Sequence, residues 1–429
     1  MLTPTFSSDL HRECFMRANV LTSVGYGSRV PCMEYRSADF HTDVRFLPII
    51  FRGLVIRSLR MPARMLVICC GLLLISFLAG CGSSPIKQPP PPLSSVFVAY
   101  VANGSDNNIS GYTINKQTGA LTGIGGAATS AGTGPFSIAV TSSGKYVYVA
   151  NAGSNNVSGY STNADANALT PVPGSPFAVG SDPAGIATDH SGKFLFVPNY
   201  QSSDISVFQI NASNGGLTPV PGSPFSSATE VIDIAVNPTG TFVYAAGQGG
   251  TLSAYSLDQQ TGVLSEIGGS PFVGGPEPSS VQITPSGNFL YVTNETTDTT
   301  YEFALDATTG AASMIGSTPA VNGAARGAAI DPSGRFLYVS DAPNGNVVGY
   351  QIDSNSGSLS QIAAGPFATG QIPFSMAFDP TGKFVYVACQ GGGVFAYAFD
   401  SSTGNLTPLS GSPFPTGNAP LWIATAKLR

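Results

Sequence analysis

The sequence predicts an all-β protein, a seven-bladed β-propeller whose blades are four-stranded and antiparallel. An aromatic-rich strand returns seven times with a period of 47 to 48 residues. Each period also contains four short strand signals, which are rich in β-branched and aromatic residues and are bounded by turn residues. A repeat of this length that contains only strands and turns is typical of a propeller blade. The 51 Gly, the 33 Pro and the low share of charged residues, 10%, fit a chain of turns and buried sheets.

The four strand signals follow one another in a fixed order. The first is the innermost strand of a blade, and its copies begin at 135, 183, 231, 278, 325, 373 and 420. A turn such as Asp331-Pro-Ser-Gly334 leads into the second strand, because Pro after Asp and Gly at the fourth place favour a type I turn. The second strand is marked by Tyr100, Tyr148, Phe196, Tyr244, Tyr291, Tyr338 and Tyr386. A third strand with its own aromatic residue follows, and the fourth ends in Ser-Pro-Phe in four copies.

The two ends of the repeat region complete one blade. The region starts with an aromatic strand from Phe97 to Asn103 and stops with a lone innermost strand from Pro420 to Thr425. We therefore expect the last segment to supply the strand that the first blade lacks, which closes the ring. Residues 94–429 then form one propeller domain.

The first 93 residues have a different character. Nine of the 18 Lys and Arg residues lie at or before Arg64, so nine basic and 19 acidic residues remain after residue 81, a net charge of about −10 (9 − 19). Three arginines that end at Arg64 precede the apolar run from Met65 to Phe77, which closes with Leu78-Ala-Gly-Cys81. A basic segment, a short apolar core and small residues predict a secretory signal peptide at 61–80 rather than a membrane span.

The ending Leu78-Ala-Gly-Cys81 resembles the lipobox of bacterial lipoproteins. The resemblance implies that Cys81 carries a lipid and becomes the first residue of the mature protein. We therefore expect the protein in the bacterial cell envelope (outer membrane, periplasm or cell surface), held to the membrane by its lipid anchor only. Residues 81–93 include four consecutive prolines and predict a tether of about 30 Å.

Residues 1–60 show no periodicity and precede a signal peptide that should lie at the start of a chain. We interpret them as an upstream extension from a mis-called start, with Met61 as the true start. The alternative, a cytoplasmic extension on a stop-transfer helix, needs a longer apolar run than this one.

The channel mouth is where we expect functional side chains, because the loops before the inner strands and after the second strands converge there. The residues just before the inner strands are Gly134, Asp182, Glu230, Glu277, Ala324, Ile372 and Ala419. One position into each strand lie Phe136, Ala184, Ile232, Ser279, Arg326, Phe374 and Leu421. The three acids and Arg326 predict a shared catalytic site, in which a carboxylate activates water while Arg326 anchors an anionic substrate or steadies an oxyanion. The alternative is that the acids are solvated loop residues.

The strand Tyr291-Val-Thr-Asn294 and its counterparts resemble the YVTN β-propeller family, and residues 94–429 are similar to the seven-bladed lactonase family that includes 6-phosphogluconolactonase. The resemblance implies hydrolysis of a lactone ester by a His that follows the Pro of an inner strand, together with Arg and acids of the mouth. This chain has no His at the seven equivalent positions, and only Arg326 matches a family position in type. His190 stands in the turn Asp189-His-Ser-Gly192, which we expect on the opposite face.

Other chemistries leave no signal. The chain lacks the motifs for haem, for zinc or copper, for nucleotides and for a calcium loop, so we expect neither a cofactor nor a metal. The acidic balance argues against nucleic acid as a partner. Cys389 has no His to activate it and is expected to be a small buried residue.

Two functions remain for what we expect to be a monomer. The first is an exported, lipid-anchored, lactonase-like hydrolase of a small lactone or ester. An exported protein would not meet phosphorylated sugar lactones, which are cytoplasmic. The alternative is a non-catalytic envelope propeller that binds a protein or polymer partner.

Overall fold

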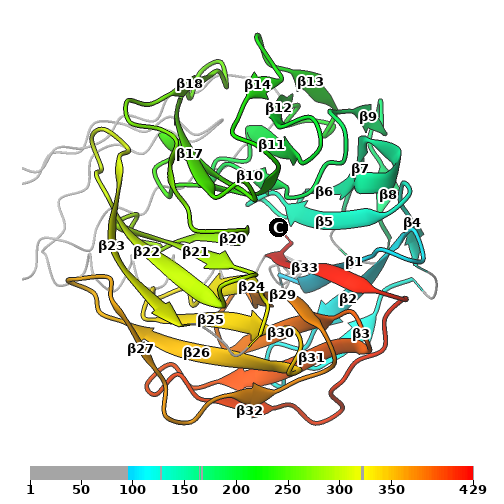
Figure 1. Ribbon diagram of the computed structural model, residues 1–429. Helices are drawn as coiled ribbons and strands as arrows, with labels where there is room; N and C mark the ends of the chain where they lie inside the picture. The colour runs from blue at the N-terminus through cyan, green and yellow to red at the C-terminus, as the bar shows by residue number, and fades with distance from the viewer. Residues whose placement is uncertain (1–94, 126–127, 164, 166–167, 320–322, 429) are drawn as a thin grey trace, which may run out of the picture. The chain divides into compact units, whose positions relative to one another are not determined.

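The computed structural model describes residues 95–125, 128–163, 165, 168–319 and 323–428. These residues form seven antiparallel sheets arranged in a ring, as Figure 1 shows. Each sheet is one blade, with four strands in the order that the sequence predicts. The predicted seven-bladed all-β fold is confirmed.

The strands fall into sets by their place in the blade. The innermost strands are β5 (Pro135–Val140), β10 (Ala187–Thr188), β15 (Val231–Val236), β20 (Pro278–Ile283), β24 (Ala325–Ile330), β29 (Pro373–Phe378) and β33 (Pro420–Lys427). The second strands are β1 (Phe97–Asn103), β6 (Tyr146–Asn151), β11 (Phe194–Asn199), β16 (Phe242–Gly247), β21 (Phe289–Asn294), β25 (Phe336–Asp341) and β30 (Phe384–Cys389). The third strands are β2 (Asn108–Ile114), β7 (Asn156–Ser161), β12 (Asp204–Ile210), β17 (Thr251–Leu257), β22 (Thr299–Leu305), β26 (Asn346–Ile352) and β31 (Gly393–Phe399).

The outer edge of a blade is shorter and is often split in two. The outer strands are β3 (Leu121–Gly123), β8 (Thr170–Pro171), β13 (Leu217–Pro219), β18 (Leu264–Glu266), β23 (Ala312–Pro319), β27 (Leu359–Gln361) and β32 (Leu406–Pro408). Five blades add a two-residue strand on the same edge: β4 (Thr129–Ser130), β9 (Phe177–Ala178), β14 (Phe225–Ser226), β19 (Phe272–Val273) and β28 (Phe367–Ala368). One short 3₁₀ turn, η1 (Ala152–Ser154), follows β6.

The last strand closes the ring. β33 pairs with β1 along its whole length, from Phe97 opposite Lys427 to Asn103 opposite Pro420. The other edge of β1 pairs with β2, so the first blade contains both ends of the described chain. Figure 1 shows the red strand β33 beside the blue strand β1. Because closure pairs the inner edge of β1, the ring has no open inner edge there.

The second strands are the core of the protein. All seven are buried at every residue, since each is covered by a neighbouring blade on both faces. Their tyrosines also link blades, because a buried hydroxyl donates to a turn carbonyl of the next blade. These bonds are Tyr148 to Gly215 (2.7 Å), Tyr244 to Gly310 (2.8 Å), Tyr291 to Gly357 (2.7 Å), Tyr338 to Gly404 (2.5 Å) and Tyr386 to Gly119 (2.7 Å). The last of them spans the closure of the ring.

One inner strand differs from the prediction. A full strand was expected from residue 183, but β10 has two residues, and Pro183 forms only an isolated bridge with Asn199. The neighbouring second strand holds Pro198, which has no N–H to donate to the inner strand. The amide of Gly185 bonds instead to the carbonyl of Ile232 in the next blade, at 2.9 Å.

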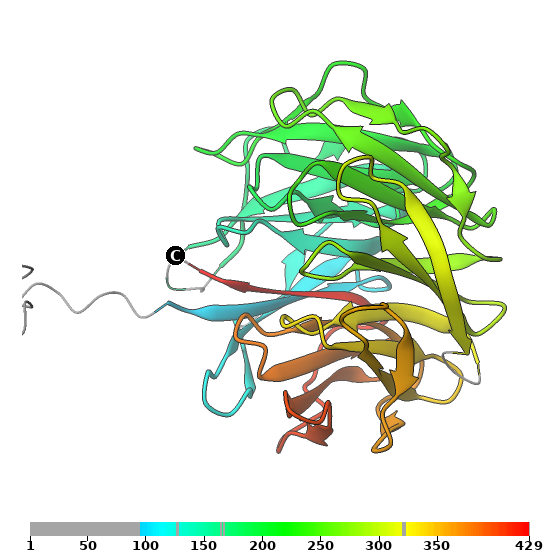
Figure 2. The same ribbon diagram turned by 90° about the vertical axis from the view of Figure 1, so that its left-hand side faces the viewer.

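The chain ends of the propeller lie on the face away from the channel mouth. β1 begins and β33 ends on that face, where the amide of Leu428 donates to the carbonyl of Val96 at 2.8 Å. Both strands meet the mouth at their other ends, where the amide of Gly104 donates to the carbonyl of Ala419 at 2.8 Å. Figure 2 shows β1 and β33 side by side with the C-terminus at one side of the ring.

The expectations for residues 1–60, 61–80 and 81–93, and for Cys81, lie outside the described residues. Within the described ranges, no helix has the length and apolar character needed to cross a bilayer.

Candidate active site

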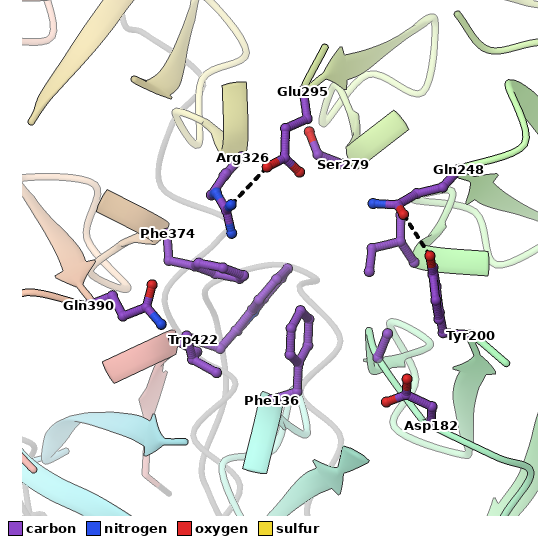
Figure 3. Close-up of a pocket in the computed structure, with 13 residues that line it drawn as sticks. Phe136, Asp182, Tyr200, Gln248, Ser279, Glu295, Arg326, Phe374, Gln390 and Trp422 are labelled. Atoms are coloured by element: carbon purple, nitrogen blue, oxygen red, sulfur yellow. Dashed lines mark hydrogen bonds and ion pairs between the residues drawn. The ribbon is translucent and has the colours of Figure 1, made fainter. Parts of the chain in front are cut away.

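A β-bulge near the start of the inner strands directs one side chain of each blade into the channel mouth. The pairing with the second strand shifts register after the first residue in six blades, so the next residue is left unpaired. In the remaining blade the interrupted strand leaves Ala184 in the equivalent place. All seven of these residues line one pocket of about 400 Å³: Phe136, Ala184, Ile232, Ser279, Arg326, Phe374 and Leu421. Figure 3 shows this pocket.

A second set of side chains comes from the residue that follows each second strand. In every blade the amide of this residue donates to the carbonyl of the residue before the inner strand, at 2.8 to 3.1 Å, which fixes both at the mouth. Four of them line the pocket: Tyr200, Gln248, Glu295 and Gln390. Sequence reasoning missed these four residues. The signal was present, because each stands directly after the small residue that ends its aromatic strand.

Most residues before the inner strands have a positive φ. Asp182, Glu230 and Glu277 have φ of 56°, 57° and 51°. Ile372 and Ala419 have the same conformation in other blades, with φ of 54° and 51°. A positive φ is unusual for residues other than Gly. Since apolar residues adopt it here too, the conformation belongs to the blade design rather than to the acids.

The structure separates the four predicted catalytic residues into two pairs. Asp182 and Arg326 line the pocket, on different sides of it. Glu230 and Glu277 are not among its lining residues. Glu277 is exposed, and its carboxylate accepts a hydrogen bond from the hydroxyl of Thr296. A catalytic role for Glu230 and Glu277 stays a prediction.

Arg326 is held in place by its neighbours. Its Nη2 donates to Oε1 of Glu295 at 2.7 Å, and its guanidinium carbon lies 5.2 Å from the centre of the Phe374 ring. The two charged side chains are about one-third exposed (33% and 28%), so the ion pair faces the pocket. Nε of Arg326 is buried and has no hydrogen-bond partner among the described residues. Glu295 therefore compensates the one positive charge of the pocket wall.

The opposite wall carries Asp182, Tyr200 and Gln248. Burial raises the pKa of Asp182 above its ordinary value. The hydroxyl of Tyr200 donates to Oε1 of Gln248 at 2.9 Å, and Figure 3 shows the amide nitrogen of Gln248 directed into the pocket. The pKa of Tyr200 is raised first by burial and then by the negative charges of Glu230, Asp182 and Glu277. These three acids thus act on one phenol, although only Asp182 reaches the pocket wall.

His190 and Cys389 lie outside the pocket wall. His190 lies exposed in the turn from Asp189 to Gly192 and is not part of the pocket wall, as predicted. Cys389 is a buried free thiol whose pKa burial raises to about 11, so it is a poor nucleophile at neutral pH. Among the described residues no group of three or more His, Cys, Asp or Glu side chains is placed to hold a metal ion.

The ring of seven four-stranded blades defines the chain as a seven-bladed β-propeller with a pocket formed by its inner strands. Within that class the chain belongs to the family described as lactonase, 7-bladed beta-propeller, which matches at residues 94–232, 217–325, 265–368 and 312–424. No curated protein sequence matches the chain.

Solved structures support the fold. A provisionally assigned 6-phosphogluconolactonase from Bacteroides fragilis is 21% identical with a TM-score of 0.67, over 79% of this chain and 100% of its own. A periplasmic gluconolactonase from Pseudomonas aeruginosa is 19% identical with a TM-score of 0.66, over 78% of this chain and 100% of its own. At such identities the likeness shows the fold alone.

Proposed function

We propose that the chain hydrolyses a small lactone or ester at the channel mouth. The observation that carries the proposal is the pocket wall, in which a carboxylate with a raised pKa and a guanidinium lie on different sides of one pocket. Membership of the lactonase propellers supports the reaction class. No His lines this pocket, and of its two carboxylates Glu295 is paired with Arg326, so we assign the general base to Asp182.

The reaction that these groups can perform is base-assisted attack of water. The Asp182 carboxylate accepts a proton from water while the water oxygen bonds to the carbonyl carbon of the lactone. The carbonyl oxygen becomes an oxyanion, which the amide of Gln248 or the guanidinium of Arg326 can stabilise. The ring C–O bond then breaks, and the leaving oxygen takes the proton back from Asp182. The product is the open hydroxy acid.

Two residues act by positioning others. Tyr200 donates to the amide oxygen of Gln248, which leaves the amide nitrogen to face the pocket. Glu295 fixes the guanidinium of Arg326 through the 2.7 Å ion pair. Because both partners are fixed before substrate arrives, less reorganisation is needed during the reaction.

A pH-stat assay of the full chain against neutral and phosphorylated lactones tests the proposal. Asp182→Asn should lower kcat by about 10²- to 10⁴-fold, the usual worth of a general base. Glu266→Gln is the control, because Glu266 is an exposed carboxylate at the end of the outer strand β18 and does not line the pocket. The acid limb of the wild-type pH profile should lie above the ordinary carboxyl range, since burial raises the pKa of Asp182. Hydrolysis of no lactone in the panel, or equal losses in both variants, would reject this base and favour a binding propeller.

We also propose that the protein is exported and held to a membrane by a lipid on Cys81. The sequence Leu78-Ala-Gly-Cys81 after a basic and apolar lead supports this. The described chain begins on the propeller face opposite the mouth. Cys81→Ser should move the protein from the membrane to the soluble fraction of a bacterial host, whereas Cys70→Ser should not. Retention of Cys81→Ser in the membrane with unchanged processing would refute the anchor.

A further inference from the structure

One side of the pocket wall is aromatic. Phe136 and Phe374 meet edge to face with ring centroids 5.4 Å apart, and Trp422 lies 6.4 Å from Phe136. The three side chains come from β5, β29 and β33, and Leu421 extends the same surface. All are only half-buried, so their free faces are turned to the pocket. Figure 3 shows these rings together, across the pocket from Tyr200 and Gln248. We call these four residues the aromatic corner.

The charges of the wall do not favour an anionic ligand. Asp182 and Glu295 contribute two carboxylates and Arg326 one guanidinium, a formal charge of −1 (1 − 2). The guanidinium is already paired at 2.7 Å and is covered on one face by Phe374. Recognition of a phosphate usually needs unpaired Arg or Lys side chains or a helix N-terminus. Arg326 is the one basic residue that lines this pocket.

We propose that the substrate is an uncharged lactone or ester with an alkyl or aryl substituent, which the aromatic corner binds. The ester carbonyl then faces Gln248 across the pocket, or Arg326 at the border of the aromatic corner. This inference rests on the proposed function for the ester, while the apolar substituent follows from the aromatic corner alone. A pocket of about 400 Å³ is of the size that small-molecule sites have.

Trp422 makes the inference measurable without turnover. It is the only Trp of the 429 residues, so selectively excited fluorescence of the full chain reports on this pocket. The probes are 5-alkyl-2-pyrrolidinones, lactams that keep the carbonyl and resist hydrolysis, with side chains from methyl to hexyl. Each added methylene should lower Kd about fourfold, equivalent to ~0.8 kcal/mol, until the aromatic corner is filled. D-Gluconolactam and 6-phosphogluconate should leave the fluorescence unchanged at the same concentrations.

Phe136→Ala should remove most of the chain-length dependence. Phe225→Ala is the matched control, because Phe225 is also half-buried but lies in the outer strand β14. Circular dichroism melts show whether either variant is unfolded. Kd values that do not change with alkyl length, or a lower Kd for 6-phosphogluconate than for the alkyl lactams, would overturn the inference.

The two proposals can fail separately. Hydrolysis of polar lactones without any alkyl dependence overturns the aromatic-corner inference and keeps the lactonase. Tight alkyl-lactam binding without hydrolysis of any alkyl lactone supports an apolar ligand and overturns the lactonase.

Discussion

Ile423→Ala tests how strongly the last strand holds the ring closed. Ile423 is 2% exposed and packs in the cluster that joins the first blade to the last, against Ala99, Val101 and Tyr386. Truncation of a buried Ile to Ala leaves a cavity and usually costs 2–5 kcal/mol, so we expect about 3 kcal/mol of lost unfolding free energy. Leu421→Ala is the control on the same strand, because Leu421 is half-buried at the mouth and should lose about 1 kcal/mol.

The assay is urea unfolding of the full chain followed by circular dichroism, with midpoints compared at equal slope. Deletion of residues 420–429 is the stronger perturbation, since it uncovers the whole inner edge of β1 and should cause aggregation or loss of the cooperative transition. If Ile423→Ala and Leu421→Ala lose the same free energy within ~1 kcal/mol, or if the deleted protein melts like the wild type, β33 does not carry the closure.

Three further predictions follow from single contacts. Tyr386→Phe removes the buried bond to Gly119 across the closure and should cost about 1–2 kcal/mol in the same unfolding assay; an unchanged midpoint would exclude the bond as a contributor. Burial raises the pKa of Asp233 from 3.8 to about 6, so folding favours the neutral carboxyl group. The free energy of unfolding should therefore decrease by on the order of 2–3 kcal/mol as the pH rises from about 4 to about 6. Asp233→Asn should flatten that slope in pH-dependent unfolding. Glu295→Gln removes the partner of Arg326, so phosphate should quench Trp422 fluorescence in the variant at about tenfold lower concentration than in the wild type, equivalent to ~1.4 kcal/mol. High salt should reduce this difference. Equal phosphate binding by the variant and the wild type would show that Glu295 does not mask the charge of Arg326.

The fold was predictable because it repeats. Each blade restates the same order of strands, and one chance similarity cannot persist over seven copies. The closure by β33 followed from the order of the two ends. The short β10 was not predicted, because its cause is one residue, Pro198, in the neighbouring strand.

The site was predictable in position but not in composition. Repeat symmetry places Phe136, Arg326 and their equivalents on one ring, and the structure puts all seven in one pocket. The pairing of Arg326 with Glu295 was missed, since it joins two blades through side-chain geometry that no spacing encodes. The spacing also did not separate the three acids. Asp182 lines the pocket, in the blade whose inner strand is interrupted, whereas Glu230 and Glu277 in the equivalent places do not.

The most direct test of the central claim is a crystal structure of the full chain with 5-hexyl-2-pyrrolidinone bound. The account predicts the lactam in the pocket at the channel mouth, with its carbonyl oxygen within hydrogen-bond distance of Gln248 or Arg326 and its hexyl chain against Phe136 and Trp422. A lactam bound on another surface, or bound at the mouth with its hexyl chain away from the aromatic corner, would contradict it.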